Sequence, residues 1–362
     1  MTTSKSAFHR FGALAVLMML PALILSGCDK VPTFQELTGN EAKPEPAPAP
    51  VVEPPPPPQA AEPVAKPPAP KTPEEIYEEF LAKEQAQRKD EDIAKLAEFD
   101  PSLRSQIQEL DMSRSQMSDK GAAMLTAFPK VEDLNIDYTG VTSVGLAEVG
   151  KLTGLKHLSL AKTRINETAL EGIDGLTDLE YLDISQTSSD DLSFQHLVGM
   201  KNLQVLRITD MPHLRGQGLA ELANRGVLSN LRELYAPNTK IGNYGLEALE
   251  KLPHLQILNL NNAAVNDIHM PLIGSRRELV TLYLERNTIS SQGVKSLAKL
   301  KNLETLSLAN CKSVQDEAFN FIKNLKTLTL LNVSGTGVTP DAVKMLQEKF
   351  LPDTEIKYDK PN

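Results

Sequence analysis

Two cysteines and six histidines are the most reactive side-chain types in this 362-residue chain, and their spacing points to little catalysis. No nucleophile elbow, paired-histidine zinc motif, Cys-x-x-Cys pair or phosphate-binding glycine loop occurs in the sequence. The histidines have no partner at metal-ligand spacing, and no convincing acid/base pair of carboxylates is present. We therefore predict no catalytic residues, no metal site, no cofactor and no enzymatic activity.

Cys28 is the side chain whose surroundings predict a reaction. Lys5 and Arg10 flank an apolar stretch from Phe11 to Leu25. That stretch is short for a membrane span, which needs roughly 20 apolar residues. Its length and its charged flank are typical of a secretory signal, and it ends in Leu25-Ser26-Gly27-Cys28.

The segment that ends at Cys28 resembles the lipobox of bacterial lipoproteins, with an aliphatic residue and two small residues before the cysteine. The resemblance implies that Cys28 is diacylated, that residues 1–27 are a signal peptide, and that the protein is anchored in the bacterial cell envelope on a membrane facing the periplasm. Asp29, directly after the cysteine, favours the inner membrane. An ordinary signal peptide, or a short membrane anchor with an incidental cysteine, is the alternative.

Proline dominates the next segment, residues 28–73, and most densely its part from Lys43 to Pro73. Proline fixes φ and donates no backbone hydrogen bond, so this stretch favours extended polyproline II. At about 3.1 Å per residue it would reach on the order of 90 Å. We predict a lipid-anchored, disordered spacer, and a docking site for proline-recognition modules is the alternative.

Residues 74–100 follow as a predicted lead-in helix. Thr72 and Glu75 have the spacing of a capping box, and Pro73 suits a first helical turn. The apolar stripe is weak, so we expect this helix either to cap the first repeat or to be solvated.

Residues 107–358 are a tandem repeat with a period near 24 residues. Leu155, Leu158 and Leu160 recur as Leu179, Leu182 and Ile184. The last unit is followed by residues 354–358, which could add an edge strand. The ten units start at Ile107, Val131, Leu155, Leu179, Leu203, Leu231, Leu255, Leu279, Leu303 and Leu328.

Each unit predicts a short strand, a turn and a helix. Strand side chains alternate, so Leu158 and Leu160 should point into the core while His157 and Ser159 face solvent. Stacked units would form a parallel sheet on a concave side and helices on a convex side. Glycine recurs just before a helix leucine or valine, where we expect it to permit a tight approach of strand and helix. These glycines are Gly145, Gly218, Gly245 and Gly293.

The turn after each strand forms a column of small polar residues. Buried hydroxyls or amides there could bond the backbone of the adjacent turn. The column comprises Ser115, Thr139, Thr163, Thr187, Met211, Thr239, Ala263, Asn287, Cys311 and Thr336.

Ile107 to about Tyr358 therefore resembles the leucine-rich-repeat superfamily, closest to its 24-residue bacterial and cysteine-containing variants. The resemblance implies an α/β, right-handed leucine-rich-repeat solenoid of about ten repeats with a horseshoe shape. In this interpretation Cys311 is a buried, unreactive ladder residue. Met211 and Ala263 depart from the ladder chemistry, so we expect local irregularity at both.

Solenoids offer extended concave surfaces to partners. Tyrosine and arginine are enriched at binding hot spots, and several fall on outward strand positions of repeats four to eight. The predicted partner-binding residues are Tyr181, Arg207, Tyr235, Asn259, Tyr283, Glu285 and Arg286.

We predict a membrane-anchored, monomeric module that binds a protein or polysaccharide of the envelope. The alternative is a passive structural spacer with no specific ligand. The net charge of −9 leaves no basic footprint, so nucleic acid is not an expected partner.

Overall fold

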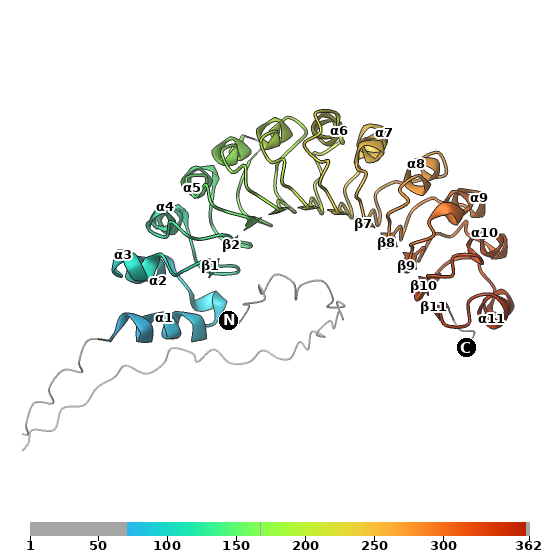
Figure 1. Cartoon of the computed structure of the whole chain (residues 1–362), viewed down its shortest axis with the longest axis horizontal. Coiled ribbons are helices and arrows are strands. Elements are labelled where there is room, and N and C mark those ends of the chain that lie inside the picture. Colours follow the sequence, from blue (N-terminus) through green and yellow to red (C-terminus); the bar gives the residue numbers. More distant parts are fainter. Residues whose placement is uncertain (1–70, 167, 360–362) are drawn as a thin grey trace, which may run out of the picture. The chain divides into compact units, whose positions relative to one another are not determined.

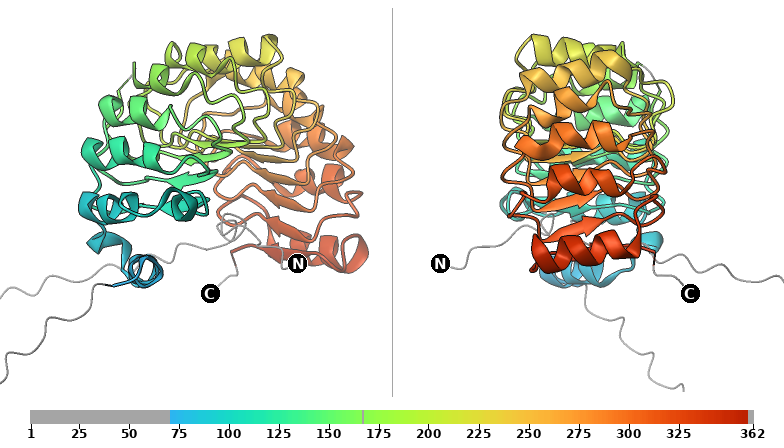
Figure 2. Two further views of the ribbon diagram at one scale, coloured as in Figure 1. Left: turned by 60° about the vertical axis from the view of Figure 1, so that its left-hand side comes forward. Right: turned by 90° about the vertical axis from the view of Figure 1, so that its right-hand side faces the viewer.

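A computed structural model describes residues 71–359 with the exception of residue 167. The described residues belong to one compact unit. Within it, one sheet of eleven parallel strands has the strand order of the sequence. The strands follow the inner side of the unit and the helices its outer side (Figures 1 and 2).

Every strand is three residues long and pairs with the strand of the next repeat. The middle residues stay in constant register, as in the pair of Leu158 with Leu182. The predicted fold class and the closing strand after the tenth repeat are confirmed. The strands are β1 (Glu109–Asp111), β2 (Asp133–Asn135), β3 (His157–Ser159), β4 (Tyr181–Asp183), β5 (Val205–Arg207), β6 (Glu233–Tyr235), β7 (Ile257–Asn259), β8 (Thr281–Tyr283), β9 (Thr305–Ser307), β10 (Leu330–Asn332) and β11 (Glu355–Lys357).

The core is a set of aliphatic columns that run through all repeats. Leu158, Leu182 and Leu206, each in the middle of a strand, have no exposed surface. Burying one such side chain contributes roughly 1.5–3 kcal/mol. Each leucine is covered by the repeats beside it, so no repeat could retain this contribution alone.

The outer layer consists of shorter helices than the leucine spacing suggests. A 24-residue repeat leaves few residues after the strand and turn, and the third and fourth repeats form only the 3-10 helices η4 and η5. The 28-residue step gives the longer α6. The helices are α1 (Pro73–Ala82), η2 (Gln85–Gln87), α2 (Asp90–Ala97), α3 (Pro101–Arg104), α4 (Asp119–Met124), η3 (Leu125–Ala127), α5 (Ser143–Val149), η4 (Ala169–Ile173), η5 (Ser193–Leu197), α6 (Gln217–Asn224), α7 (Gly242–Glu247), η6 (Ala248–Lys251), α8 (Met270–Gly274), α9 (Ser291–Val294), η7 (Lys295–Lys299), η8 (Asp316–Ala318), α10 (Phe319–Ile322) and α11 (Pro340–Lys349).

The lead-in segment is two helices with a turn between them, and not the single helix expected for residues 74–100. Thr72 and Glu75 form the expected capping box at the start of α1. The chain then turns around Arg88, whose guanidinium lies 4.5 Å from the Phe80 ring centroid. That guanidinium donates to the carbonyls of Leu81, Lys83 and Asp111. A buried guanidinium needs such acceptors, and a continuous helix would not supply them.

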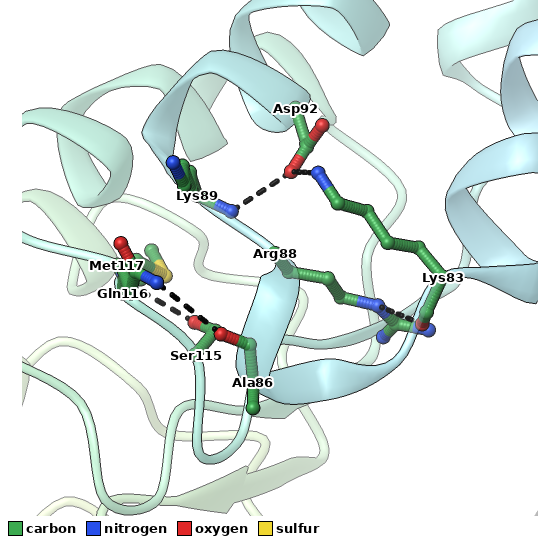
Figure 3. Close-up of polar contacts among 8 residues, drawn as sticks. All are labelled: Lys83, Ala86, Arg88, Lys89, Asp92, Ser115, Gln116 and Met117. Carbon is green, nitrogen blue, oxygen red and sulfur yellow. Dashed lines mark hydrogen bonds and ion pairs between the residues drawn. The ribbon is translucent and has the colours of Figure 1, made fainter.

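Polar contacts hold this turn against the first repeat (Figure 3). Lys83 Nζ lies 2.6 Å from Asp92 Oδ2 and so links the turn to α2. The Gln116 N–H donates to the Arg88 carbonyl at 2.9 Å. Ile93 and Leu96 of α2 are fully buried, and α2 packs against α4. These contacts cover the apolar side chains of the first repeat.

The turn column bonds backbone carbonyls, but not always those of the adjacent turn. Thr163 Oγ1 donates to Leu160 O of its own repeat at 2.7 Å, and Thr139, Thr187 and Thr336 do the same in theirs. Cys311 is fully buried, its Sγ lies 3.2 Å from Leu284 O, and burial raises the pKa of its thiol. It has the place expected for a ladder residue.

Where the ladder chemistry is interrupted, the next repeat supplies the missing polar group. Thr239 Oγ1 accepts the Met211 N–H at 3.0 Å and donates to Ile208 O at 2.6 Å. Asn287 Oδ1 likewise accepts the Ala263 N–H at 3.2 Å. The expected irregularity therefore becomes a contact between repeats.

Aspartates in the segment that leads into a helix, or at its first residue, form a second contact between repeats that the leucine pattern does not reveal. Asp119 Oδ1 accepts the N–H groups of Thr142 and Gly145, at 2.7 and 3.0 Å, in the next repeat. A Cβ on Gly145 would lie 2.5 Å from this oxygen. Asp267 and Gly293 repeat the arrangement at 2.2 Å. Glycine at these two positions thus makes room for a carboxylate of the preceding repeat. The expectation that it permits a tight approach of strand and helix was wrong at both.

The Gly145→Ala substitution should therefore destabilise the protein by about 1–3 kcal/mol, because the new methyl group displaces Asp119. Helix propensity alone predicts the opposite sign, since alanine is favoured over glycine inside a helix by roughly 0.5–1 kcal/mol. Gly175→Ala is the matched control because nothing lies within 4 Å of its Cβ position. Urea unfolding that gave both variants equal stability would contradict this account.

Asp137 bonds the next repeat from the inner side of the sheet. Its Oδ1 accepts the Ser159 hydroxyl at 2.7 Å and the Ala161 N–H at 2.6 Å. Burial, reinforced by Asp183 and Asp111 and opposed by those hydrogen bonds, raises the pKa of Asp137 to about 6.

An aspartate ionises near pH 3.9 in the unfolded chain, so the folded state binds more protons between about pH 4 and pH 6. This group therefore lowers stability as pH rises through that window. Asp137→Asn keeps the acceptor oxygen but does not titrate. The free energy of unfolding of this variant minus that of wild type should be larger at pH 7 than at pH 4, by about 1–3 kcal/mol. A difference that stays constant across urea titrations in this range would exclude a raised Asp137 pKa.

Candidate functional site

The inner face of the sheet displays two columns of side chains. The first and third residues of each strand face this side, while the middle residue is in the core. The first residues of the strands form one column. The third residues form the other, which we call the second inner column. It consists of Asp111, Asn135, Ser159, Asp183, Arg207, Tyr235, Asn259, Tyr283, Ser307, Asn332 and Lys357.

Four of the predicted site residues occupy consecutive positions of the second inner column. The register pairs Arg207 with Tyr235, Tyr235 with Asn259, and Asn259 with Tyr283. Neighbouring strands of a sheet lie about 4.8 Å apart, so these side chains adjoin one another. Tyr181 is the first residue of β4 and belongs to the neighbouring column.

Arg207 is the centre of a connected group. Its guanidinium carbon lies 4.3 Å from the Tyr235 ring centroid, and its Nε lies 3.4 Å from Asp183 Oδ2. The Tyr235 hydroxyl donates to Glu233 Oε2 at 2.8 Å. We call Asp183, Arg207, Glu233 and Tyr235 the Arg207 cluster.

The Arg207 cluster is partly withdrawn from water. Its arginine side chain is 32% exposed and its aspartate side chain only 11%. Burial raises the pKa of Asp183, although Ser185 and Arg207 favour its ionised form. Burial and Glu233 raise the pKa of Tyr235, and its hydroxyl is the donor to Glu233.

The other predicted residues have varied surroundings. Asn259 Oδ1 accepts the Asn261 N–H at 3.1 Å, and Glu285 Oε1 accepts the Ser307 hydroxyl at 2.7 Å. Tyr283 is half-buried, and burial together with Glu285 raises its pKa. Arg286 is exposed on the loop after β8. Arg286 is therefore the exposed member of this group, while Asn259, Tyr283 and Glu285 are each partly buried.

Tyr181 adjoins an acid–histidine pair. Its ring centroid lies 6.2 Å from that of His157, with the planes tilted by 59°. His157 Nδ1 in turn contacts the carboxylate of Asp133. His157 thus faces the inner side as predicted, but with a charged neighbour that sequence reasoning left out.

Two members of the Arg207 cluster were absent from the predicted site, namely Asp183 and Glu233. The sequence carries a usable signal for Asp183, because it directly precedes Arg207 in the second inner column. Opposite charges in facing positions of adjacent strands attract. Glu233 is two residues before Tyr235 on the same strand, so it faces the same side. Its hydrogen bond depends on side-chain conformation, which the sequence does not give.

In the described part of the chain, no group of three or more histidine, cysteine, aspartate or glutamate side chains is placed to hold a metal ion. None of the helices described there combines the length and apolar character of a membrane span. Cys28, the predicted lipidation site, lies outside the described residues.

Comparison with known proteins identifies the architecture. No family model and no curated protein sequence matches the chain. An internalin (InlF) from Listeria monocytogenes is 18% identical and aligns over 75% of this chain and 94% of its own, with a TM-score of 0.50. A chain of the yeast Rad7–Elc1 complex is 15% identical over 74% of this chain and 71% of its own, with a TM-score of 0.51. At these identities the likeness concerns the fold alone.

The sequence period, the constant strand register and the similarity to an internalin agree. The repeat region of this chain therefore has the leucine-rich-repeat fold.

Proposed function

We propose that this protein is a binding scaffold whose inner sheet face, centred on the Arg207 cluster, recognises a protein partner. The observation that carries the proposal is the contact of Arg207 with both Tyr235 and Asp183 on a partly desolvated surface. Arginine and tyrosine dominate binding energy when they lie in such surroundings. Tyr283 lies two strands from Tyr235 in the second inner column and extends the surface.

The fold supports this proposal in general terms. Leucine-rich-repeat solenoids present long concave surfaces on which the fold constrains few outward side chains. One structural neighbour was solved as a complex of Rad7 with Elc1, so a protein of this fold occurs in a protein complex. A passive envelope spacer has no need for a half-buried ion pair that faces solvent, and Asp183 with Arg207 forms one.

A protein fits the Arg207 cluster better than a polysaccharide does. Sugars stack on free aromatic faces, and one face of the Tyr235 ring is covered by the Arg207 guanidinium. The cluster also combines both charge signs with a hydroxyl donor, which suits the mixed polar groups of a protein surface.

We further propose that the scaffold is anchored to a membrane of the bacterial envelope through Cys28. The support is the charged flank, the apolar stretch and the Leu25-Ser26-Gly27-Cys28 ending of the amino-terminal segment. The proline-rich segment after Cys28 would hold the repeats away from the membrane surface.

Replacing both Tyr235 and Tyr283 by alanine should weaken capture of a saturable partner from crosslinked envelopes by about 30-fold or more, since a single hot-spot residue contributes about 2 kcal/mol. The double variant keeps both members of the half-buried Asp183–Arg207 pair, so folding should be retained. Tyr244→Ala is the matched control because Tyr244 is 57% exposed on the outer helix α7. Unchanged capture by the double variant would exclude this surface, and capture of no single saturable partner by wild type would favour the passive spacer.

Cys28→Ala should abolish metabolic labelling of the protein with a fatty acid and release it from membranes. The expected cause is the loss of the only thiol in the lipobox-like sequence. Equal labelling of both proteins, measured by radiolabelled palmitate and gel analysis, would refute the anchor without affecting the binding proposal.

A further inference from the structure

Left-handed backbone recurs at the edge of the sheet where the strands end. One residue per repeat, three positions after the strand, has φ between 51° and 70°. We name these residues the αL column. Its members are Arg114, Tyr138, Lys162, Gln186, Asp210, Asn238, Asn262, Arg286, Asn310 and Gly335.

The residue types in the αL column are unevenly suited to this backbone. Glycine, asparagine and aspartate tolerate the left-handed region, whereas long or bulky side chains raise its cost. Asn238, Asn262 and Asn310 show that asparagine serves the turn in this chain. The first three repeats instead hold an arginine, a tyrosine and a lysine in succession. Strained conformations of this kind concentrate at functional positions.

These three side chains form one exposed stack. The Arg114 guanidinium carbon lies 4.6 Å from the Tyr138 ring centroid, and Lys162 Nζ lies 5.0 Å from it. Tyr138 is 40% exposed, and both cations are exposed. In the part of the chain that the structure describes, neither cation makes an ion pair with a carboxylate. The Tyr138 ring thus lies against two exposed cations.

Stability alone does not account for the stack. Cation–π contacts at exposed sites contribute little. Asparagines in the same column bond each other instead, with Asn262 Nδ2 2.9 Å from Asn238 Oδ1. Asparagine in the first three repeats would give comparable contacts on a better-suited backbone.

We propose that the Arg114–Tyr138–Lys162 stack is a second interaction surface, which binds a carboxylate-bearing segment of a protein partner. Arginine binds carboxylates through two parallel hydrogen bonds, and lysine adds a compact charge. This surface lies in repeats one to three and is independent of the inner-face patch of repeats four to eight.

The surroundings favour a short acidic segment over an extended polyanion. Glu109, Asp111 and Asp133 belong to β1 and β2, the strands that lead into the stack. A nucleic acid or an acidic polysaccharide would bring its charges next to these carboxylates, and like charges repel. A sugar ring would also compete with the two cations for the faces of Tyr138.

A labelled hexaglutamate peptide tests the proposal against hexaglutamine of the same length. The full chain should bind hexaglutamate in fluorescence anisotropy at low salt, with weaker binding as salt rises. Arg114→Gln with Lys162→Gln should weaken that binding about tenfold or more. Tyr138→Asn should weaken it as well while leaving Tm within about 2 °C, because three repeats of the same chain already use asparagine there.

Arg277→Gln is the matched control, since Arg277 is exposed after the outer helix α8 and lies outside both proposed surfaces. Its hexaglutamate binding should equal that of wild type. Equal affinity for the two peptides, or equal losses in the Arg277 and Arg114–Lys162 variants, would overturn the proposal. It would also be overturned if the same variants lost binding to phosphatidylglycerol vesicles while wild type bound no peptide, because the ligand would then be a lipid surface.

Discussion

The close approach of consecutive repeats is the constraint on which the rest of this structure depends. Strands of three residues make few hydrogen bonds, so each repeat is stabilised mainly by the polar and apolar groups that its neighbours supply. The carboxylate of Asp119 fits against Gly145 only because that glycine has no Cβ. Thr239 can accept a hydrogen bond from the Met211 N–H because the turns of their two repeats are in contact. A side chain that separated two repeats would break several such contacts together.

Constant register follows from that approach, and register divides the positions of a repeat into two kinds. Middle strand positions always meet a leucine or isoleucine of the next repeat, so their chemistry is uniform. Outward positions meet whatever the next repeat carries, and their chemistry varies from Ser159 to Arg207. An interacting group such as Arg207 with Tyr235 arises when suitable types fall on adjacent repeats. Function can therefore change at outward positions while the core stays the same.

The part of the structure that follows from local alternation could be predicted from the sequence. The spacing of Leu155, Leu158 and Leu160 places a strand and orients it, because burial alternates along any strand. Contacts between side chains and backbone groups of neighbouring repeats could not be predicted in the same way. Asp119 looks like an ordinary helix-start residue and Gly145 like an ordinary flexible one, and only their three-dimensional proximity explains both. The turn at Arg88 escaped prediction for the same reason, since one of its acceptors is the carbonyl of Asp111 in β1.

The candidate site likewise has a part that could be predicted from the sequence and a part that could not. Its column could be predicted because strand register is a repeat property, whereas the bond from Tyr235 to Glu233 depends on side-chain conformation. The αL column extends the argument, because every repeat imposes the same backbone there regardless of residue type. A position whose conformation is set by its neighbours has no need of a particular side chain. An unfavourable type such as Tyr138 is then informative, since the fold would accept asparagine in its place. Stability and specificity thus reside at different positions of one repeating unit.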